Sequence, residues 1–149
     1  YNSNNNRTMG QLGEYLYNNI HGNLTYYGGD ILFKYKGFSF EGELYNRESN
    51  RGVVVNSKDS TQKNYFTSGR TFLLQSGIFI SKRSEIAVRY ARIDPSSKII
   101  SLFPKQEEYV LGYSRYFLKH NLKLQTDCTF MKVGNKETLI YRLSWVMTF

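Results

Sequence analysis

The chain has little of several features that mark common protein classes. It has one cysteine, Cys128, among 149 residues, so no disulfide can form within the chain. No run of about eighteen apolar residues is present, which excludes a membrane-spanning helix. The first residues, YNSNNNRTMG, are polar and contain no signal peptide, as expected of a mature chain or a fragment. The length predicts one domain, residues 1–149, without room for a second core.

Aromatic and basic residues are abundant. The 13 tyrosines and 10 phenylalanines fit β-strands and membrane-interface girdles better than helices. The net charge of +8 is compatible with nucleic acid, an acidic surface or small anions as partners, and basicity alone does not choose among them. A polar average composition is also compatible with a membrane β-barrel, because half of every strand faces water.

The last twelve residues, TLIYRLSWVMTF, alternate in polarity. The odd-numbered positions from Leu139 to Phe149 are all large and apolar or aromatic, whereas the even-numbered positions are mostly polar. In a strand this pattern gives one apolar face and one wet face, typical of a strand between lipid and water. The end of the chain is similar to the C-terminal signal of bacterial outer-membrane barrels, which the barrel assembly machinery would recognise. That signal is predicted to comprise Tyr141, Trp145, Met147 and Phe149.

Six further segments alternate with a period of two residues, and no stretch has a helical period. They are Asp30–Lys36, Phe38–Tyr45, Arg70–Ile80, Glu85–Arg92, Glu108–Leu118 and Leu122–Met131. The two faces of Glu108–Leu118 are ambiguous, since both contain large apolar residues. Seven strands in up-and-down order leave two open edges, which lipid does not tolerate. Either Thr8–Tyr17, which alternates poorly, closes an eight-stranded barrel, or further strands lie upstream.

The connections between these strands alternate in length. Short ones are predicted at Lys36–Gly37, Ser81–Ser84 and Lys119–Asn121, and longer polar ones at Asn46–Gly69, Ile93–Glu107 and Lys132–Glu137. Outer-membrane barrels have short periplasmic turns and longer external loops. The sequence therefore predicts an all-β, antiparallel, up-and-down transmembrane β-barrel in the outer membrane of a Gram-negative bacterium.

Several segments carry a family resemblance. SEIAVRYARIDP (Ser84–Pro95), EEYVLGYSRYFLKHNLKLQTDCTF (Glu107–Phe130) and the terminal Phe149 resemble the phosphate-selective porin O/P family. GGDILFKYKGFSFEGELYNR (Gly28–Arg47) and GRTFLLQSGIFI (Gly69–Ile80) are similar to its hairpins, especially in Bacteroidetes-type bacteria. The resemblance implies a barrel of sixteen strands, usually in trimers, of which this chain would be the C-terminal half. It also implies anion selectivity but assigns no binding residue here.

Basic side chains on the polar strand faces are the pore-lining candidates. They are Lys34, Lys36, Arg89, Lys123 and Arg142. A water-filled lumen with basic walls concentrates anions and repels cations. Glu41, Glu43 and Asp127 are expected on the same face, so a salt-bridged polar wall is the alternative interpretation of each residue.

Catalysis and metal binding have little support in the sequence. The only histidines are His21 and His120, and neither has a nucleophile or an orienting partner at recognisable spacing. There is no Cys-x-x-Cys or His-x-x-x-His spacing and no glycine-rich phosphate loop. The aromatic residues lie away from most strand charges, which disfavours a nucleic-acid binder. We therefore expect no enzymatic activity, metal or cofactor.

The leading hypothesis is an outer-membrane porin that lets small, phosphate-like anions diffuse passively. Its expected partners are lipid, lipopolysaccharide, small anions, and either two further copies of itself or other outer-membrane proteins. One alternative is a closed eight-stranded barrel with a structural, adhesive or scaffold role. A second alternative is a soluble ligand-binding barrel with its apolar face turned inward, which the C-terminal alternation and the loop lengths disfavour.

Overall fold

The computed structural model describes residues 2–3, 22–55, 63–118 and 122–147, and these residues form strands, turns and loops without a helix. The long strands are β2 (Gly22–Tyr35), β3 (Phe38–Ser49), β6 (Gly69–Ser81), β7 (Ser84–Pro95), β8 (Gln106–Leu118), β9 (Leu122–Val133) and β10 (Lys136–Met147). The short strands are β1 (Asn2–Ser3), β4 (Val53–Val55) and β5 (Lys63–Tyr65).

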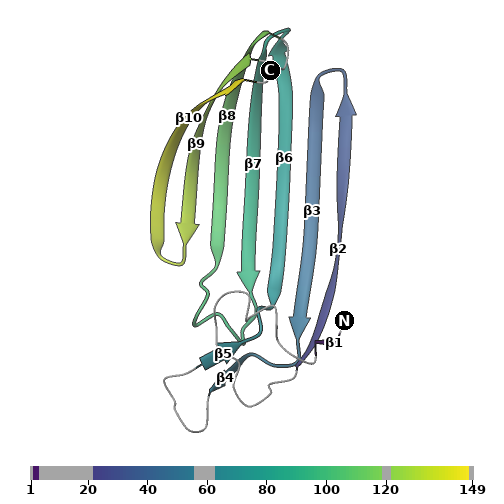
Figure 1. The fold of residues 1–149 in the computed structure, drawn as a ribbon, viewed down its shortest axis with the longest axis vertical. Coiled ribbons are helices and arrows are strands. Elements are labelled where there is room, and N and C mark those ends of the chain that lie inside the picture. The colour runs from purple at the N-terminus through teal and green to yellow at the C-terminus, as the bar shows by residue number, and fades with distance from the viewer. Residues whose placement is uncertain (1, 4–21, 56–62, 119–121, 148–149) are drawn as a thin grey trace. The chain divides into compact units, whose positions relative to one another are not determined.

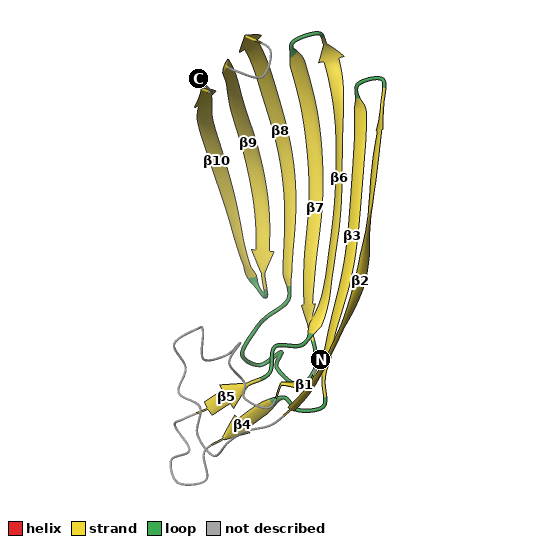
Figure 2. Ribbon diagram, turned by 45° about the vertical axis from the view of Figure 1, so that its right-hand side comes forward, coloured by secondary structure: helices red, strands yellow, loops and turns green. Residues whose placement is uncertain are grey.

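The long strands form one antiparallel sheet in the order β2-β3-β6-β7-β8-β9-β10, with β1 added beside β2 (Figures 1 and 2). All seven predicted strands are confirmed, and most extend beyond the predicted segments. Among the described residues, no pairing joins β10 to the other edge, so the sheet is open and the predicted barrel is not closed. The candidate eighth strand, Thr8–Tyr17, lies outside the described residues.

Two of the predicted short connections are confirmed as tight turns: Lys36–Gly37 joins β2 to β3, and the two residues between Ser81 and Ser84 join β6 to β7. Lys36 and Gly37 both have positive φ, as two-residue hairpin turns of the favoured hand require. The prediction of a long loop at Lys132–Glu137 was wrong, because β9 continues to Val133 and β10 begins at Lys136. Gly134, with φ 57°, allows the two-residue turn. Lys132 and Glu137 are paired strand residues, and their polarity alone made them look like a loop. Residues 119–121 lie outside the described part of the chain.

The chain divides into two compact units. We call residues 1–28, 45–70 and 94–105 the loop unit, and residues 29–44, 71–93 and 106–149 the strand unit. The loop unit has a small apolar cluster in which Leu24 is 5 % exposed and Phe66 is fully buried, with Val54 and Tyr65 packed against them. Tyr65 also makes an edge-on contact with Phe103 at a centroid distance of 4.8 Å. Apolar side chains in this unit therefore hide from water, as in a soluble protein.

Gly69 begins β6 with φ 152°, a conformation that only glycine adopts readily. A Cβ atom at this position would collide with the Asp94 carbonyl oxygen and lie 2.8 Å from the Pro95 Cα atom. We expect Gly69→Ala to lower the free energy of unfolding by about 2–4 kcal/mol, because backbone would have to move. Urea unfolding of refolded protein measures this loss, with Gly29→Ala, which meets open space, as the control. Equal midpoints for both variants would contradict the prediction.

Candidate functional site

One face of the strand unit is mostly apolar, although Ser84, Arg115 and Thr126 also lie on it. The strand registers align Val88 with Leu111, Leu111 with Cys128, and Cys128 with Tyr141. We define the apolar face by Ile31, Phe33, Phe40, Leu44, Phe72, Leu74, Ile78, Val88, Tyr90, Tyr109, Leu111, Tyr113, Leu124, Cys128, Phe130, Leu139, Tyr141, Leu143, Trp145 and Met147. Many of these side chains are exposed, including Leu111 at 57 % and Leu143 at 69 %. This face needs an apolar environment that the described residues do not supply.

Aromatic rings lie in contact along one line across this face. We call Phe72, Tyr90, Tyr109 and Phe130 the aromatic row; consecutive centroids are 6.2, 4.8 and 6.3 Å apart on β6, β7, β8 and β9. Nearer the other end of β8, Phe117 stacks on Trp145 at 6.0 Å. The stretch from Tyr109 to Phe117 spans nine residues of β8, and about 9–11 residues suffice for a tilted strand to cross a membrane. Paired aromatic girdles at this spacing are typical of membrane barrels.

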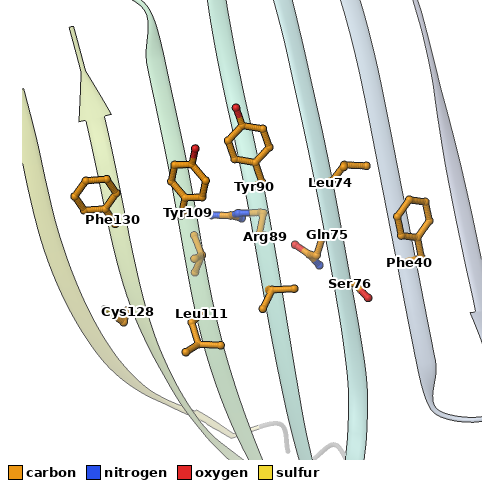
Figure 3. Close-up of a pocket in the computed structure, with 12 residues that line it drawn as sticks. Phe40, Leu74, Gln75, Ser76, Arg89, Tyr90, Tyr109, Leu111, Cys128 and Phe130 are labelled. Carbon is orange, nitrogen blue, oxygen red and sulfur yellow. The ribbon is translucent and has the colours of Figure 1, made fainter. Parts of the chain in front are cut away.

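A shallow groove of about 560 Å³ lies beside the aromatic row. Its lining includes Leu74, Tyr90, Leu111, Cys128 and Phe130. Figure 3 shows Tyr90, Tyr109 and Phe130 side by side on neighbouring strands, with Leu111 and Cys128 next to them. The groove offers almost entirely apolar atoms, so its chemistry suits hydrocarbon.

The opposite face, which we call the polar face, carries most of the charged strand residues beside apolar ones such as Val110 and Ile140, and in β8 it is the more enclosed face. In β8 the residues of the apolar face, such as Tyr109 and Leu111, are exposed, whereas their neighbours Val110 and Gly112 are half-buried. Glu108, Ser114 and Tyr116 are half-buried on the same polar face. A water-soluble sheet would hide its apolar side instead. The arrangement is therefore inverted relative to a soluble barrel.

Two of the predicted lining residues form cross-strand ion pairs on the polar face. The guanidinium of Arg89 donates to Glu108 at 2.6 Å, and that of Arg142 donates to Asp127 at 2.9 Å. Arg142 also donates to the Thr129 hydroxyl at 2.9 Å, and Thr129 is 1 % exposed. These partners neutralise both arginines, so the two residues stiffen the wall and contribute little net charge.

Of the other predicted lining residues, Lys34 lies on β2, Lys123 lies on β9, and Lys36 lies in the turn between β2 and β3. Lys34 and Lys123 form no ion pair with any described residue, and the Lys36 ammonium lies 5.2 Å from the centre of the Tyr35 ring. Glu41 and Glu43 are likewise without ion pairs among the described residues. Net charge on this face therefore depends on these lysines and glutamates together with Glu85, and the structure brings Lys34 and Lys36 into the lining of one cavity.

Glu85 and Tyr116 meet at the end of the polar face near the β6–β7 turn. The Tyr116 hydroxyl donates to Glu85 at 2.6 Å, and its ring lies 5.6 Å from Phe79. A cavity of about 410 Å³ is lined by these residues together with Lys34 and Lys36. The sequence pattern did not indicate this contact, because it depends on the pairing of strands.

The loop unit contains a second polar cluster. Arg70 donates from Nε to the Asn46 amide oxygen at 3.2 Å, and the Asn46 amide nitrogen donates to Glu48 at 2.8 Å. Lys98 donates to the Ser49 carbonyl oxygen at 2.7 Å. These residues line a cavity of about 390 Å³. The cluster was not predicted, since residues about fifty positions apart in the chain meet there.

The proposed C-terminal signal lies mostly on β10. Tyr141, Trp145 and Met147 are exposed on the apolar face, and Trp145 is the member that stacks on Phe117. Phe149 lies outside the described residues, as do His21 and His120. The described part of the chain contains no cluster of three or more potential metal ligands. In the same part, no helix has the length and apolarity to cross a membrane.

The ion pair between Arg89 and Glu108 gives a measurable prediction. Their side chains are only 36 % and 30 % exposed, and Arg89 Nε is buried without a hydrogen bond. We expect Glu108→Gln to lower the free energy of unfolding by about 1–2 kcal/mol, because a partly buried guanidinium loses its carboxylate. The matched control is Glu137→Gln, because the pair between Glu137 and Lys132 is more exposed. This substitution should lower the free energy of unfolding by less than about 0.5 kcal/mol. Comparable losses in both variants, measured by urea unfolding, would argue against a structural role for the inner pair.

Comparison with known proteins identifies no relative: no family model, no curated protein and no solved structure matches this chain.

Proposed function

We propose that this chain forms part of the wall of an outer-membrane β-barrel porin through which small anions diffuse passively. The observation that carries the proposal is the inverted burial of the strand unit: exposed large apolar residues on one face and half-buried polar residues on the other. Lipid would cover the apolar face and water would fill the space on the polar face. In this reading residues 1–149 are a single barrel domain, the C-terminal part of a longer barrel.

The aromatic row and the Phe117–Trp145 pair support this orientation. Tyrosine and tryptophan favour the boundary between hydrocarbon and water, because their rings are apolar and their polar atoms need partners. The nine residues of β8 between these two levels then cross the hydrocarbon. Leu24 and Phe66 of the loop unit are buried within the protein itself, so this unit needs no lipid to cover them.

Conduction would need no cofactor and no chemical step. Lys34, Lys36 and Lys123 would supply positive charge to the lumen, while Arg89 and Arg142 are held by carboxylates. Phosphate-like anions are the solute class that the resemblance of Gly28–Phe149 to phosphate-selective porins implies. Lipopolysaccharide, the barrel assembly machinery and a homotrimer or other outer-membrane proteins complete the proposed partners.

The cross-strand ion pairs favour a second candidate, a small closed barrel with a structural or scaffold role. Small barrels have interiors filled by side chains, and ladders such as Arg142–Asp127–Thr129 are suited to that interior. Such a barrel would be integral to the membrane and would not conduct ions.

Reversal potential across a planar bilayer in a KCl gradient tests the proposal, using protein extracted from its native membrane. We expect open-channel currents that favour chloride over potassium. A silent bilayer, with incorporation of the barrel shown separately, would refute the porin and favour the closed barrel. Resistance to extraction by alkaline carbonate tests the membrane location independently of conduction.

A further inference from the structure

The apolar face carries charged side chains near both of its ends, and the two ends differ in charge balance. At one end the strand registers align two basic and two acidic residues in a single row across β7 to β10: Arg92, Glu107, Lys132 and Glu137. The Lys132 ammonium lies 3.4 Å from the Glu137 carboxylate. Opposite charges alternate along this row, so they compensate one another.

The other end carries an arginine without a carboxylate. There the registers align Ser84, Arg115, Leu124 and Trp145, which we call the arginine row. The next row inward also lacks an acid; it consists of Ile86, Tyr113, Thr126 and Leu143. Glu85 follows Ser84 on β7, but its carboxylate belongs to the polar face, where the Tyr116 hydroxyl donates to it. Arg115 therefore forms no ion pair with any described residue.

Hydroxyl groups hold the Arg115 guanidinium on this face. Its Nη1 atom donates to the Ser84 hydroxyl at 2.7 Å, and the same hydroxyl lies 3.2 Å from that of Tyr113. Ser84 is only 3 % exposed, whereas Arg115 itself is exposed. A guanidinium has five N–H donors. The contact with Ser84 thus fixes the group and leaves further donors for an acceptor from outside.

The β6–β7 turn adds two cations at the same end of the strand unit. The backbone N–H of Tyr116 donates to the Arg83 carbonyl oxygen at 2.8 Å, so the turn lies against the strand that carries Arg115. Both Lys82 and Arg83 are exposed. This end of the sheet is therefore suited to an anion that lies at its surface.

We infer that the arginine row binds the phosphodiester group of an anionic phospholipid. The inference rests on the proposed membrane location. Arginine suits this ligand because its planar N–H groups can pair with two phosphate oxygens. The stack of Phe117 on Trp145 marks the same level as the boundary between hydrocarbon and water. Short turns of outer-membrane barrels are periplasmic, and phospholipids form the periplasmic leaflet of that membrane.

The groove on the apolar face accommodates the hydrocarbon of such a lipid. Leu111, which lines the groove, is four residues from Arg115 on β8, a distance of about 14 Å along the strand. One leaflet of the hydrocarbon core is about 15 Å thick, so an acyl chain anchored at Arg115 reaches the groove. A free phosphate ion would use the guanidinium and leave the groove uncovered, which favours the lipid.

Trp145 is the single tryptophan of the chain and belongs to the arginine row, so its fluorescence can test the site. The full-length protein is reconstituted in phosphatidylcholine vesicles with a small fraction of lipid whose acyl chains are brominated and quench tryptophan on contact. This lipid is either phosphatidylglycerol or phosphatidylcholine. We expect brominated phosphatidylglycerol to associate about fivefold more strongly, roughly the factor of one basic residue at an anionic surface. Arg115→Gln should abolish the preference, and Arg115→Lys should retain part of it.

Lys132→Gln is the matched control, since it removes a cation from the other end of the same face and should keep the preference. Quenching by brominated phosphatidylcholine shows that each variant is inserted. Three results would overturn the inference: a preference that survives Arg115→Gln, an equal loss in Lys132→Gln, or a loss when inorganic phosphate is added at constant ionic strength. Equal quenching of the unaltered protein by both lipids also refutes the phospholipid site, but only that site. If neither lipid quenches Trp145, the membrane location itself is refuted.

Discussion

Replacement of Leu143 by lysine is expected to lower the free energy of unfolding in lipid by about 2–4 kcal/mol. Leu143 is 69 % exposed on the apolar face, and it lies between the level of the aromatic row and that of Trp145. In water such a substitution at an exposed position would change stability by less than about 0.5 kcal/mol. In hydrocarbon the ammonium group loses its hydration, so the same change is costly. The measurement is urea unfolding of protein refolded into lipid vesicles.

Two other substitutions on β10 make this result specific. Ser144→Lys places the same charge one residue away on the polar face and should leave stability nearly unchanged. Leu139→Lys lies level with Phe130 in the aromatic row and should cost only about 0–1 kcal/mol, because the side chain reaches the interface. If all three variants unfold at the same urea concentration, the apolar face does not contact lipid.

Replacing Lys34 and Lys123 by glutamate, which reverses the charge at both positions, is expected to weaken chloride selectivity. A unit charge about 5 Å from a passing ion contributes about 0.8 kcal/mol in water, equivalent to roughly a fourfold preference. Salt screens part of this effect. We expect the double variant Lys34→Glu/Lys123→Glu to reduce the chloride-to-potassium permeability ratio by about five- to tenfold, measured as a shift of the reversal potential.

Opposite and neutral changes serve as controls for selectivity. Glu41→Gln/Glu43→Gln removes unpaired carboxylates from the same face and should increase chloride preference. Lys82→Glu changes the net charge as much as a single lysine reversal but lies in the turn between β6 and β7, so its effect should be smaller. If the polar-face variants have the same reversal potential as the unaltered protein, the ions pass elsewhere or the lumen is closed.

Alternation of polarity was sufficient to predict every long strand. Local pattern carries this information, because each strand needs one apolar face regardless of its neighbours. Alternation could not assign the two faces of β8, because Val110 and Leu111 lie on opposite faces and both are apolar. The registers resolve this by placing Leu111 between Val88 and Cys128, while an irregularity between Tyr116 and Leu118 breaks the period near the strand end.

Contacts between distant residues could not be predicted from one sequence. The Arg89–Glu108 pair and the aromatic row depend on how strands are aligned, and a shift of one residue would separate them. Packing of Leu24 against Phe66 joins segments more than forty residues apart. The short β9–β10 turn was missed because Lys132 and Glu137 are charged, as loop residues often are. The two residues are in fact directly paired on the adjacent strands β9 and β10.

The order of the strands also has a consequence for the rate at which the sheet can form. Strands β6 to β10 each pair with their neighbour in sequence, and β9 and β10 are separated by only two residues. Local pairing requires little loss of chain entropy and is fast, whereas β3 and β6 must first close the segment between Ser49 and Gly69. Assembly should therefore begin with the three hairpins that two-residue turns join, β2–β3, β6–β7 and β9–β10, with the β3–β6 pairing as the slow step.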